Sequence, residues 1–199
     1  MELMRGRPII LASRSPRRRM LLEEAGIRID AQIANIDDGL LEPQGTAAAN
    51  WTMALAYLKA SHALMHVAHS ELAEALVIGG DTVCEHDGVI MGQPSSASHA
   101  RQMLLTMRAA QHRVWSGLCL LWSGGRRLVV EHADVHLGSL SDEEIEAYVQ
   151  TDAWRGKAGG YNLSDRLEDG WPIQIHGAAS TIMGLPMSQL GQLIKEVPQ

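Results

Sequence analysis

The stretch "RPIILASRSPRRRMLLEEAG", residues 7–26, carries the signals of a buried strand followed directly by a helix. The apolar run within residues 7–12 predicts the strand. Ser15 is a typical N-cap, Pro16 suits the first helical position, and Gly26 ends the helix. A strand that leads straight into a helix is the basic step of an α/β chain.

Four arginines lie within residues 14–19, at the start of this predicted helix. Each cation there is disfavoured by roughly 0.3–1 kcal/mol, because the N-terminal end of the helix dipole is positive. A bound phosphate would remove that penalty, since helix N-termini offer free backbone N–H groups. Ser13 and Ser15 would add hydroxyls, and Arg17 and Arg18 would add bidentate donors.

The alternative is a solvated charged face, in which Arg19 pairs with Glu23 one turn later. The pattern by itself favours neither interpretation. The formal net charge is −6, yet six of the 17 Lys and Arg residues fall within residues 5–19. Positive charge that is local in an acidic chain suits a small anionic ligand better than a nucleic acid or an anionic membrane.

The composition indicates one globular domain over residues 1–199. No apolar run approaches the roughly 20 residues that a membrane span needs. The two cysteines do not make a disulfide framework, so we expect a cytoplasmic protein.

Strand and helix patterns alternate along the chain, with hairpins between them. We expect strands within 27–36, 75–94, 112–138 and 180–183, and helices over 46–69, 95–110, 139–150 and from Pro186. The 75–94 segment contains a Gly-Gly break and a hairpin at Asp87-Gly88, and Ser141 with Glu144 forms a capping box. These patterns predict an α/β fold with a mixed, partly antiparallel sheet flanked by helices.

Asp81 follows a buried apolar strand and two glycines, in "GGDTV". Open α/β sheets place ligands at the carboxyl ends of their strands. A carboxylate there would hold a divalent cation against phosphates or activate a water molecule. The alternative, which the motif alone favours, is an aspartate that caps a turn.

Two further motifs contain candidate ligands. Lys157 lies in the glycine-rich "KAGGYN", where it would reach a phosphate oxygen, or would be an ordinary exposed loop lysine. Asp37 and Asp38 in "NIDDG" would add carboxylates to a metal site, or would form a turn before Gly39.

Two sets of histidines and cysteines resemble metal sites only superficially. His62, His66 and His69 have helical spacing but no matching carboxylate or cysteine, so we expect surface histidines. Cys84 and Cys119 lie in apolar strands, where cysteine is usually inert.

Four motifs in order resemble the Maf (septum-formation) family. They read "LASRSPRR" (11–18), "GGDTVCEHDGVIMGQP" (79–94), "SDEEIEAYVQTDAWRGKAGGYNLSD" (141–165) and "MGLPM" (183–187). The resemblance covers nearly the whole chain, roughly residues 8 to 195. It implies a Maf/ITPase-like α/β fold, and usually a homodimer.

The resemblance also implies metal-dependent hydrolysis of a nucleoside triphosphate to the monophosphate and pyrophosphate, with Mg²⁺, Mn²⁺ or Co²⁺. The family's preferred substrates are dTTP, UTP, CTP and modified nucleotides, which gives it a house-cleaning role. An older association with septum formation suggests a link to cell-division arrest.

The family's functional positions fall on particular residues of this chain. Asp81 matches the proton acceptor and metal-linked base, while Lys59 and Lys157 match active-site lysines. The positions that match phosphate binding or substrate choice are Ser13, Ser15, Arg17, Arg18 and Thr82.

Three positions depart from the family pattern. Asp38 stands where the family's acidic pair ends in Glu, and Gln93 replaces a lysine that would face phosphate. Ser164 replaces a glutamine of the pyrimidine-nucleotide branch, and Asp165 replaces the glycine that follows it. Losing the cation at Gln93 removes a contact worth roughly 1.5–3 kcal/mol, and losing the amide at Ser164 bears on base choice.

The mechanism expected from these residues is attack of an activated water on the α-phosphorus. Asp81 would activate the water, and Asp81 with Asp38 would hold the metal. The first alternative is a nucleotide-binding regulator of septum formation with weakened catalysis, motivated by Gln93 and Ser164. The second is a small nucleic-acid-binding module, which the acidic balance disfavours.

Overall fold

The computed structural model describes residues 7–33, 36 and 41–198. Its strands are β1 (Ile9–Ala12), β2 (Ala31–Gln32), β3 (Leu76–His86), β4 (Val89–Met91), β5 (Ala110–Trp122), β6 (Gly125–Leu137) and β7 (Ile173–His176). Its helices are α1 (Pro16–Glu24), α2 (Ala48–Val67), α3 (Ala97–Met107), α4 (Asp142–Gln150), the 3₁₀ helix η1 (Ala158–Gly160), α5 (Leu163–Glu168), α6 (Ala179–Met183) and α7 (Met187–Glu196). None of these helices is long and apolar enough to cross a membrane.

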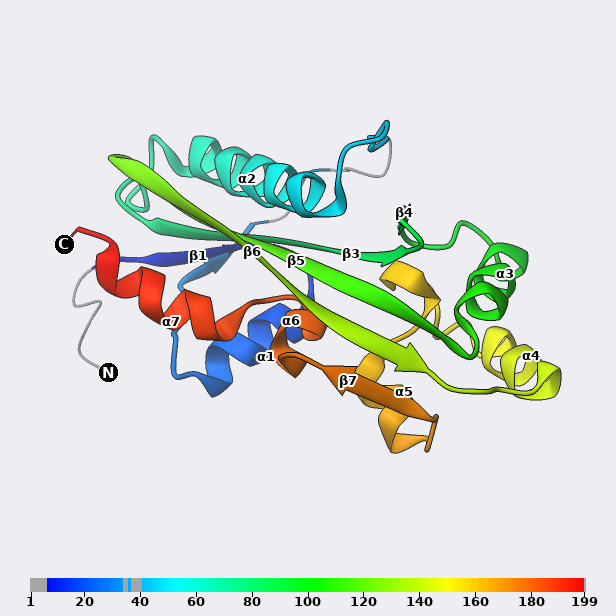
Figure 1. Cartoon of the computed structure of the whole chain (residues 1–199). Helices are drawn as coiled ribbons and strands as arrows, with labels where there is room; N and C mark the ends of the chain where they lie inside the picture. The colour runs from blue at the N-terminus through cyan, green and yellow to red at the C-terminus, as the bar shows by residue number, and fades with distance from the viewer. Residues whose placement is uncertain (1–6, 34–35, 37–40, 199) are drawn as a thin grey trace. The chain divides into compact units, whose positions relative to one another are not determined.

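The strands form a mixed sheet in the order β2-β1-β3-β5-β6-β7, with β4 paired to β3 (Figure 1). The β1 strand runs parallel to β2 and β3, whereas β3–β4 and β6–β7 are antiparallel. The predicted fold class, α/β with a mixed and partly antiparallel sheet, is therefore confirmed.

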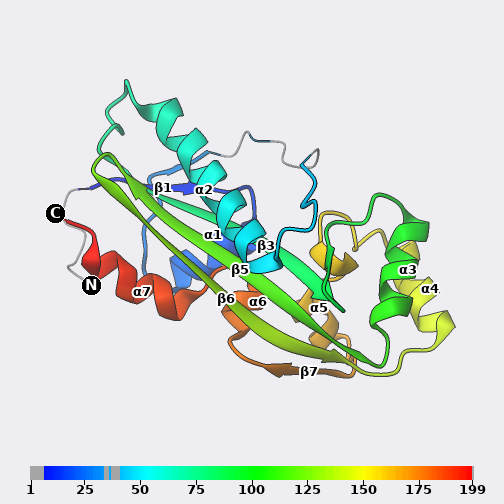
Figure 2. The ribbon, with the colours of Figure 1, turned by 45° about the horizontal axis from the view of Figure 1, so that its top comes forward.

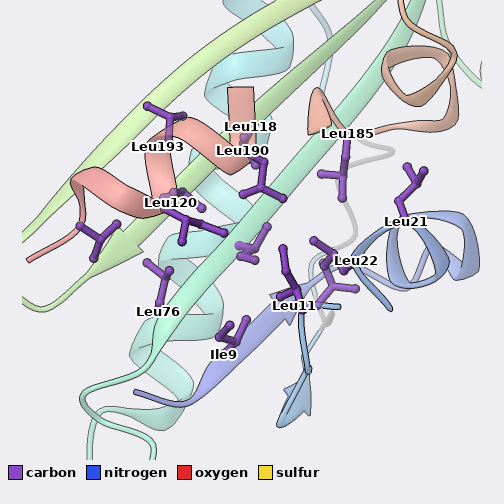
Figure 3. Close-up of a cluster of buried hydrophobic side chains, with 14 of the residues drawn as sticks. Ile9, Leu11, Leu21, Leu22, Leu76, Leu118, Leu120, Leu185, Leu190 and Leu193 are labelled. Carbon is purple, nitrogen blue, oxygen red and sulfur yellow. The ribbon is translucent and has the colours of Figure 1, made fainter. Parts of the chain in front are cut away.

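The chain divides into two compact units, of which the first comprises residues 1–81, 116–131 and 183–199. Alternate residues of its strands bury opposite faces. Ile9 and Leu11 of β1 pack with α1 and α7, as Figure 3 shows. Ile10 and Ala12 pack instead with α2, which lies across the other face (Figure 2). This unit therefore has a helix–sheet–helix arrangement with two apolar layers.

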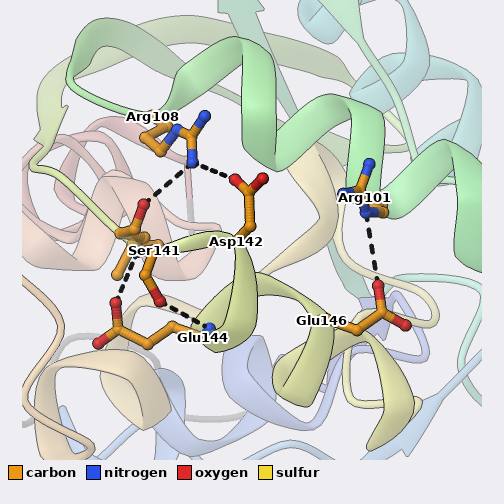
Figure 4. A network of polar contacts seen from close by, with 7 residues as sticks. Arg101, Arg108, Ser141, Asp142, Glu144 and Glu146 are labelled. Atoms are coloured by element: carbon orange, nitrogen blue, oxygen red, sulfur yellow. Dashed lines mark hydrogen bonds and ion pairs between the residues drawn. The ribbon is translucent and has the colours of Figure 1, made fainter.

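The second unit comprises residues 82–115 and 132–182. Its core joins α3 and α4 to the residues around Trp154 and Tyr161. The predicted capping box is present, because Ser141 Oγ accepts from Glu144 N and Glu144 Oε2 accepts from Ser141 N (Figure 4). Arg108 reaches from the end of α3 to Asp142 at 2.6 Å, so the two helices are joined at their polar ends as well.

Two sequence predictions about local structure are wrong. The β3 strand continues through Gly79 and Gly80, where we expected a break. Residues 180–183, expected to be a strand, belong to α6. In both places tertiary packing outweighs local preference: α2 lies close against Gly79, and Thr181 of α6 is fully buried despite its β-branched side chain.

Candidate active site

The β1–α1 turn is built around two serine hydroxyls. Ser13 Oγ accepts from Ser15 N at 3.2 Å, and Ser15 Oγ accepts from Arg18 N at 3.4 Å as the N-cap of α1. Pro16 begins the helix, as predicted. The amide of Gln32 donates to the carbonyl of Ser13, which ties the turn to β2. The predicted strand–turn–helix is confirmed, and it presents a helix N-terminus beside hydroxyl groups.

Arg18 is buried beneath this turn. Its Nη1 donates to Ser13 Oγ at 2.9 Å, and its Nε donates to the carbonyl of Gly184 at 2.9 Å. The guanidinium also lies against β3, since a Cβ added at Gly80 would come within 3.1 Å of Nε. Arg18 therefore connects the turn to β3 and to the "MGLPM" segment. The sequence motif contained Gly184, but sequence reasoning assigned it no role.

The other arginines of the cluster differ from Arg18 in exposure. Arg17 is half-buried in the first turn of α1, and Arg14 is exposed. Arg19 is exposed and its Nε pairs with Glu23 Oε1 at 2.7 Å. The predicted surface pair is thus present, on a different side of the helix from Arg18.

Asp81 and Lys59, both in the first unit, form an ion pair. Lys59 Nζ lies 2.6 Å from Asp81 Oδ1, and the two side chains are 19% and 9% exposed. Asp81 is buried in β3, and Lys59 comes from α2. The 22 residues between them hide this contact from local sequence patterns, and only the family resemblance had named both.

Close packing of α2 on β3 makes this ion pair possible. A Cβ at Gly79 would lie 2.3 Å from the carbonyl oxygen of Ala56 and 2.9 Å from Ala60 Cβ. Gly117 of β5 has the same role against Thr52, where a Cβ would lie 2.5 Å from the carbonyl oxygen. These glycines let the helix backbone approach the sheet, and sequence reasoning missed both.

In the second unit, the Lys157 loop lies beside the segment that carries Gln93. Gly159 N donates to Gly92 O at 3.0 Å. Lys157 is half-buried and Gln93 is exposed. Thr82 and Ser164 are each half-buried, in β3 and in the first turn of α5. Asp37 and Asp38 lie outside the described residues.

His62 is half-buried and His66 and His69 are exposed, in agreement with the predicted surface histidines. His62 and His66 stack at 6.3 Å between ring centroids. Across residues 7–33, 36 and 41–198, no group of three or more His, Cys, Asp or Glu side chains could hold a metal. Burial raises the pKa of both Cys84 and Cys119 to about 12, so neither thiol is activated.

Fold and site together define an α/β protein whose candidate site combines a serine-lined helix N-terminus with a buried Asp–Lys pair. The family model described as Maf-like protein matches residues 8–197. The chain therefore belongs to the Maf-like family, as the four motifs predicted.

Curated relatives match along almost the full length. The dTTP/UTP pyrophosphatase of Salinibacter ruber is 35% identical over 190 residues, covering 94% of this chain and 90% of that protein. The protein of the same name from Clostridioides difficile is 37% identical over 194 residues, covering 94% of both chains. The one from Chlorobaculum parvum is 34% identical over 189 residues, covering 95% of this chain and 94% of that protein.

Proposed function

We propose that this chain is a metal-dependent nucleoside triphosphate pyrophosphatase, which releases pyrophosphate and leaves a nucleoside monophosphate. The comparisons confirm the enzyme class expected from the sequence, because the matched relatives are named dTTP/UTP pyrophosphatases. The observation that carries the proposal for this chain is the Lys59–Asp81 pair, in the same compact unit as the Ser13–Arg18 turn.

Phosphate binding is proposed for the β1–α1 turn. The N-terminus of α1 offers backbone N–H groups and a positive dipole end, and Ser13 and Ser15 line the turn. Arg17 would supply the guanidinium contact to a phosphate oxygen. The buried Arg18 already donates to Ser13 and Gly184, so we assign it the task of holding the turn in shape.

The chemical step is proposed for Asp81 and Lys59. The Asp81 carboxylate accepts a proton from a water molecule as the water oxygen attacks the α-phosphorus. The bond from the α-phosphorus to the bridging oxygen then breaks, and pyrophosphate leaves. Lys59 Nζ lies 2.6 Å from that carboxylate, so it orients the base and is placed to offset charge on a phosphate oxygen nearby.

For the candidate residues of the second unit we propose the roles that the family resemblance implies. Lys157 would contact a phosphate oxygen, and Gln93 would give a neutral contact where the family has a cation. Thr82 and Ser164 would bear on the choice of base. We expect Ser164 to weaken a preference for dTTP and UTP, since it lacks the amide of the pyrimidine-nucleotide branch.

A divalent cation, Mg²⁺, Mn²⁺ or Co²⁺, is proposed to accompany the nucleotide. Among the described residues Asp81 is the candidate carboxylate, and Asp38 stays a predicted second ligand. A single carboxylate fits this use, since Mg²⁺ commonly binds through one or two carboxylates together with substrate phosphates. When bound, the cation would neutralise charge on the triphosphate.

Four other expectations stay predictions: one functional domain over residues 1–199, a homodimer, a cytoplasmic location, and a house-cleaning role with a link to cell-division arrest. The alternative of a regulator with weakened catalysis rests on Gln93 and Ser164. It differs from the proposal by one outcome, nucleotide binding without turnover.

The deciding experiment measures pyrophosphate release from canonical and modified nucleoside triphosphates with each cation. Asp81→Asn keeps the side-chain shape and should remove nearly all turnover. Asp87→Asn, the same change at an exposed hairpin position, is the matched control and should keep wild-type rates. Wild-type turnover in Asp81→Asn would exclude the assigned base, and binding without turnover in the unmodified protein would support the regulator.

A further inference from the structure

The second unit contains a buried polar pair that the proposed mechanism does not use. His112 Nε2 and the Tyr161 hydroxyl lie 2.7 Å apart, and the rings meet edge to face with centroids 5.8 Å apart. His112 is 2% exposed and Tyr161 is 8% exposed. The pair joins β5 to the residue that directly follows η1, across 49 positions of sequence.

Tyr161 ends the loop that carries Lys157, and this loop has an unusual backbone. Gly159 and Gly160 have φ values of 69° and 80°, in the left-handed region that glycine tolerates best. Gly159 N donates to Gly92 O, and Tyr148 Oη donates to Gly160 O at 2.9 Å. Each residue from Gly159 to Tyr161 is therefore held by a different partner within the second unit.

Both members of the pair are neutral near pH 7. Burial, together with smaller effects of His86 and His136, lowers the pKa of His112 to about 4. Burial raises the pKa of Tyr161 far above its usual range. The contact is thus a hydrogen bond between two neutral groups. Among the described residues His112 Nδ1 has no hydrogen-bond partner, so it is the hydrogen bond to Tyr161 that offsets the free-energy cost of burying this polar side chain.

We infer that His112 is a positioning residue: by holding the Tyr161 hydroxyl, it fixes the conformation of residues 157–161 and so the place of Lys157. The inference rests on the proposed function for its consequence in catalysis, and on geometry alone for the conformation of the loop. It gives a role to two residues that no part of the proposed chemistry requires.

Two apolar side chains at positions 112 and 161 would fill the same space without forming a hydrogen bond. The surrounding cluster includes Cys84, Met107 and Trp154, so a Leu and a Phe would pack there comfortably. Replacing both partners of a buried hydrogen bond by apolar groups is often nearly neutral for stability. Unlike dispersion contacts, a hydrogen bond depends on the relative orientation of its two groups, so it fixes where the Tyr161 side chain lies. The double variant His112→Leu/Tyr161→Phe should therefore separate stability from loop position.

The first readout is trypsin cleavage after Lys157 in the native protein, mapped by mass spectrometry. Tyr161→Phe and the double variant should be cleaved there about tenfold faster than wild type. Losing one hydrogen bond should raise the population of the locally opened, cleavable loop by about that factor. Tyr57→Phe makes the same chemical change on the exposed face of α2 and should be cleaved as wild type is. His112→Gln, whose amide can reach the Tyr161 hydroxyl, should restore protection that His112→Leu loses.

The second readout is steady-state pyrophosphate release. Tyr161→Phe and His112→Leu should raise KM for the nucleotide about tenfold with a smaller change in kcat, and His112→Gln should recover most of the loss. Wild-type cleavage and wild-type KM in Tyr161→Phe would overturn the inference. If the unmodified protein hydrolyses no nucleotide, the proposed function fails, and the cleavage assay alone decides whether the pair fixes the loop.

Discussion

The close approach of α2 to β3 at Gly79 gives a prediction whose size follows from the structure. A Cβ at this position would lie 2.3 Å from the Ala56 carbonyl oxygen and 2.9 Å from Ala60 Cβ. Neither obstacle is the end of a flexible side chain. Favourable contacts of carbon atoms begin near 3.5 Å, so Gly79→Ala must move α2 away from the strand by about 1 Å.

That movement should affect both stability and activity. Overpacking of this kind costs about 1–3 kcal/mol, and for a chain of this length each kcal/mol lowers Tm by roughly 2–4 °C. Lys59 lies three residues after Ala56 on the same helix, so its 2.6 Å contact with Asp81 lengthens as α2 moves. A misplacement of about 1 Å near a reacting group costs on the order of 10²-fold in rate, which is the loss of kcat/KM we expect.

The assay pairs thermal unfolding with pyrophosphate release, and Gly191→Ala is the control. A Cβ at Gly191, in the middle of α7, would meet nothing within 4 Å, and alanine there should stabilise the helix by about 1 kcal/mol. If Gly79→Ala keeps the wild-type Tm, the packing argument is wrong. If Tm falls but kcat/KM does not, the placement of Lys59 by α2 is not what supports turnover.

Four further predictions concern single side chains. The pKa of His112 is lowered from 6.5 to about 4, so as the pH falls the unfolded chain binds a proton at this position before the folded protein does. The contribution of His112 to stability is therefore complete above pH 6.5 and is lost as the pH drops towards 4. In urea unfolding at a series of pH values, the free energy of unfolding of His112→Gln should fall less steeply than that of wild type over this range. Ser141→Ala removes the N-cap of α4 and should cost about 1 kcal/mol in the same assay. In Arg18→Lys the ammonium group cannot replace the planar guanidinium that donates to both Ser13 and Gly184, so the free energy of unfolding should fall by about 1.5–3 kcal/mol. Arg19→Ala, which removes an exposed pair, should change the free energy of unfolding by less than about 0.5 kcal/mol.

The parts of the fold that sequence predicted are those with local signals. Ser15 and Pro16 mark the start of α1, and Ser141 marks that of α4 through its capping box. The hairpin at Asp87-Gly88 has the expected positive φ values of 49° and 77°. In each case the residue acts on backbone groups within a few positions of itself, so a single stretch of sequence contains the whole cause.

The errors and omissions have non-local causes. Gly79 looks like a strand break because glycine is flexible, yet its missing Cβ serves the approach of a helix some 20 positions earlier in the chain. The Lys59–Asp81 and His112–Tyr161 contacts join residues 22 and 49 positions apart. No periodicity or spacing rule can pair such residues, and the family resemblance supplied the first pair but not the second.

The arginines at the start of α1 lie in different environments, and the solvated face that one interpretation predicted accounts for only part of the cluster. Neighbouring helical residues point about 100° apart, so a run of arginines is distributed over several environments. Arg19 faces solvent and pairs with Glu23, which is the solvated face. Arg18 faces inward and donates hydrogen bonds to Ser13 and Gly184, so it supports the turn that we propose for phosphate binding. Arg17 is half-buried, with an exposure between those of Arg18 and Arg19, so one run of arginines occupies three environments and the cost of a cation at this helix end differs from one to the next.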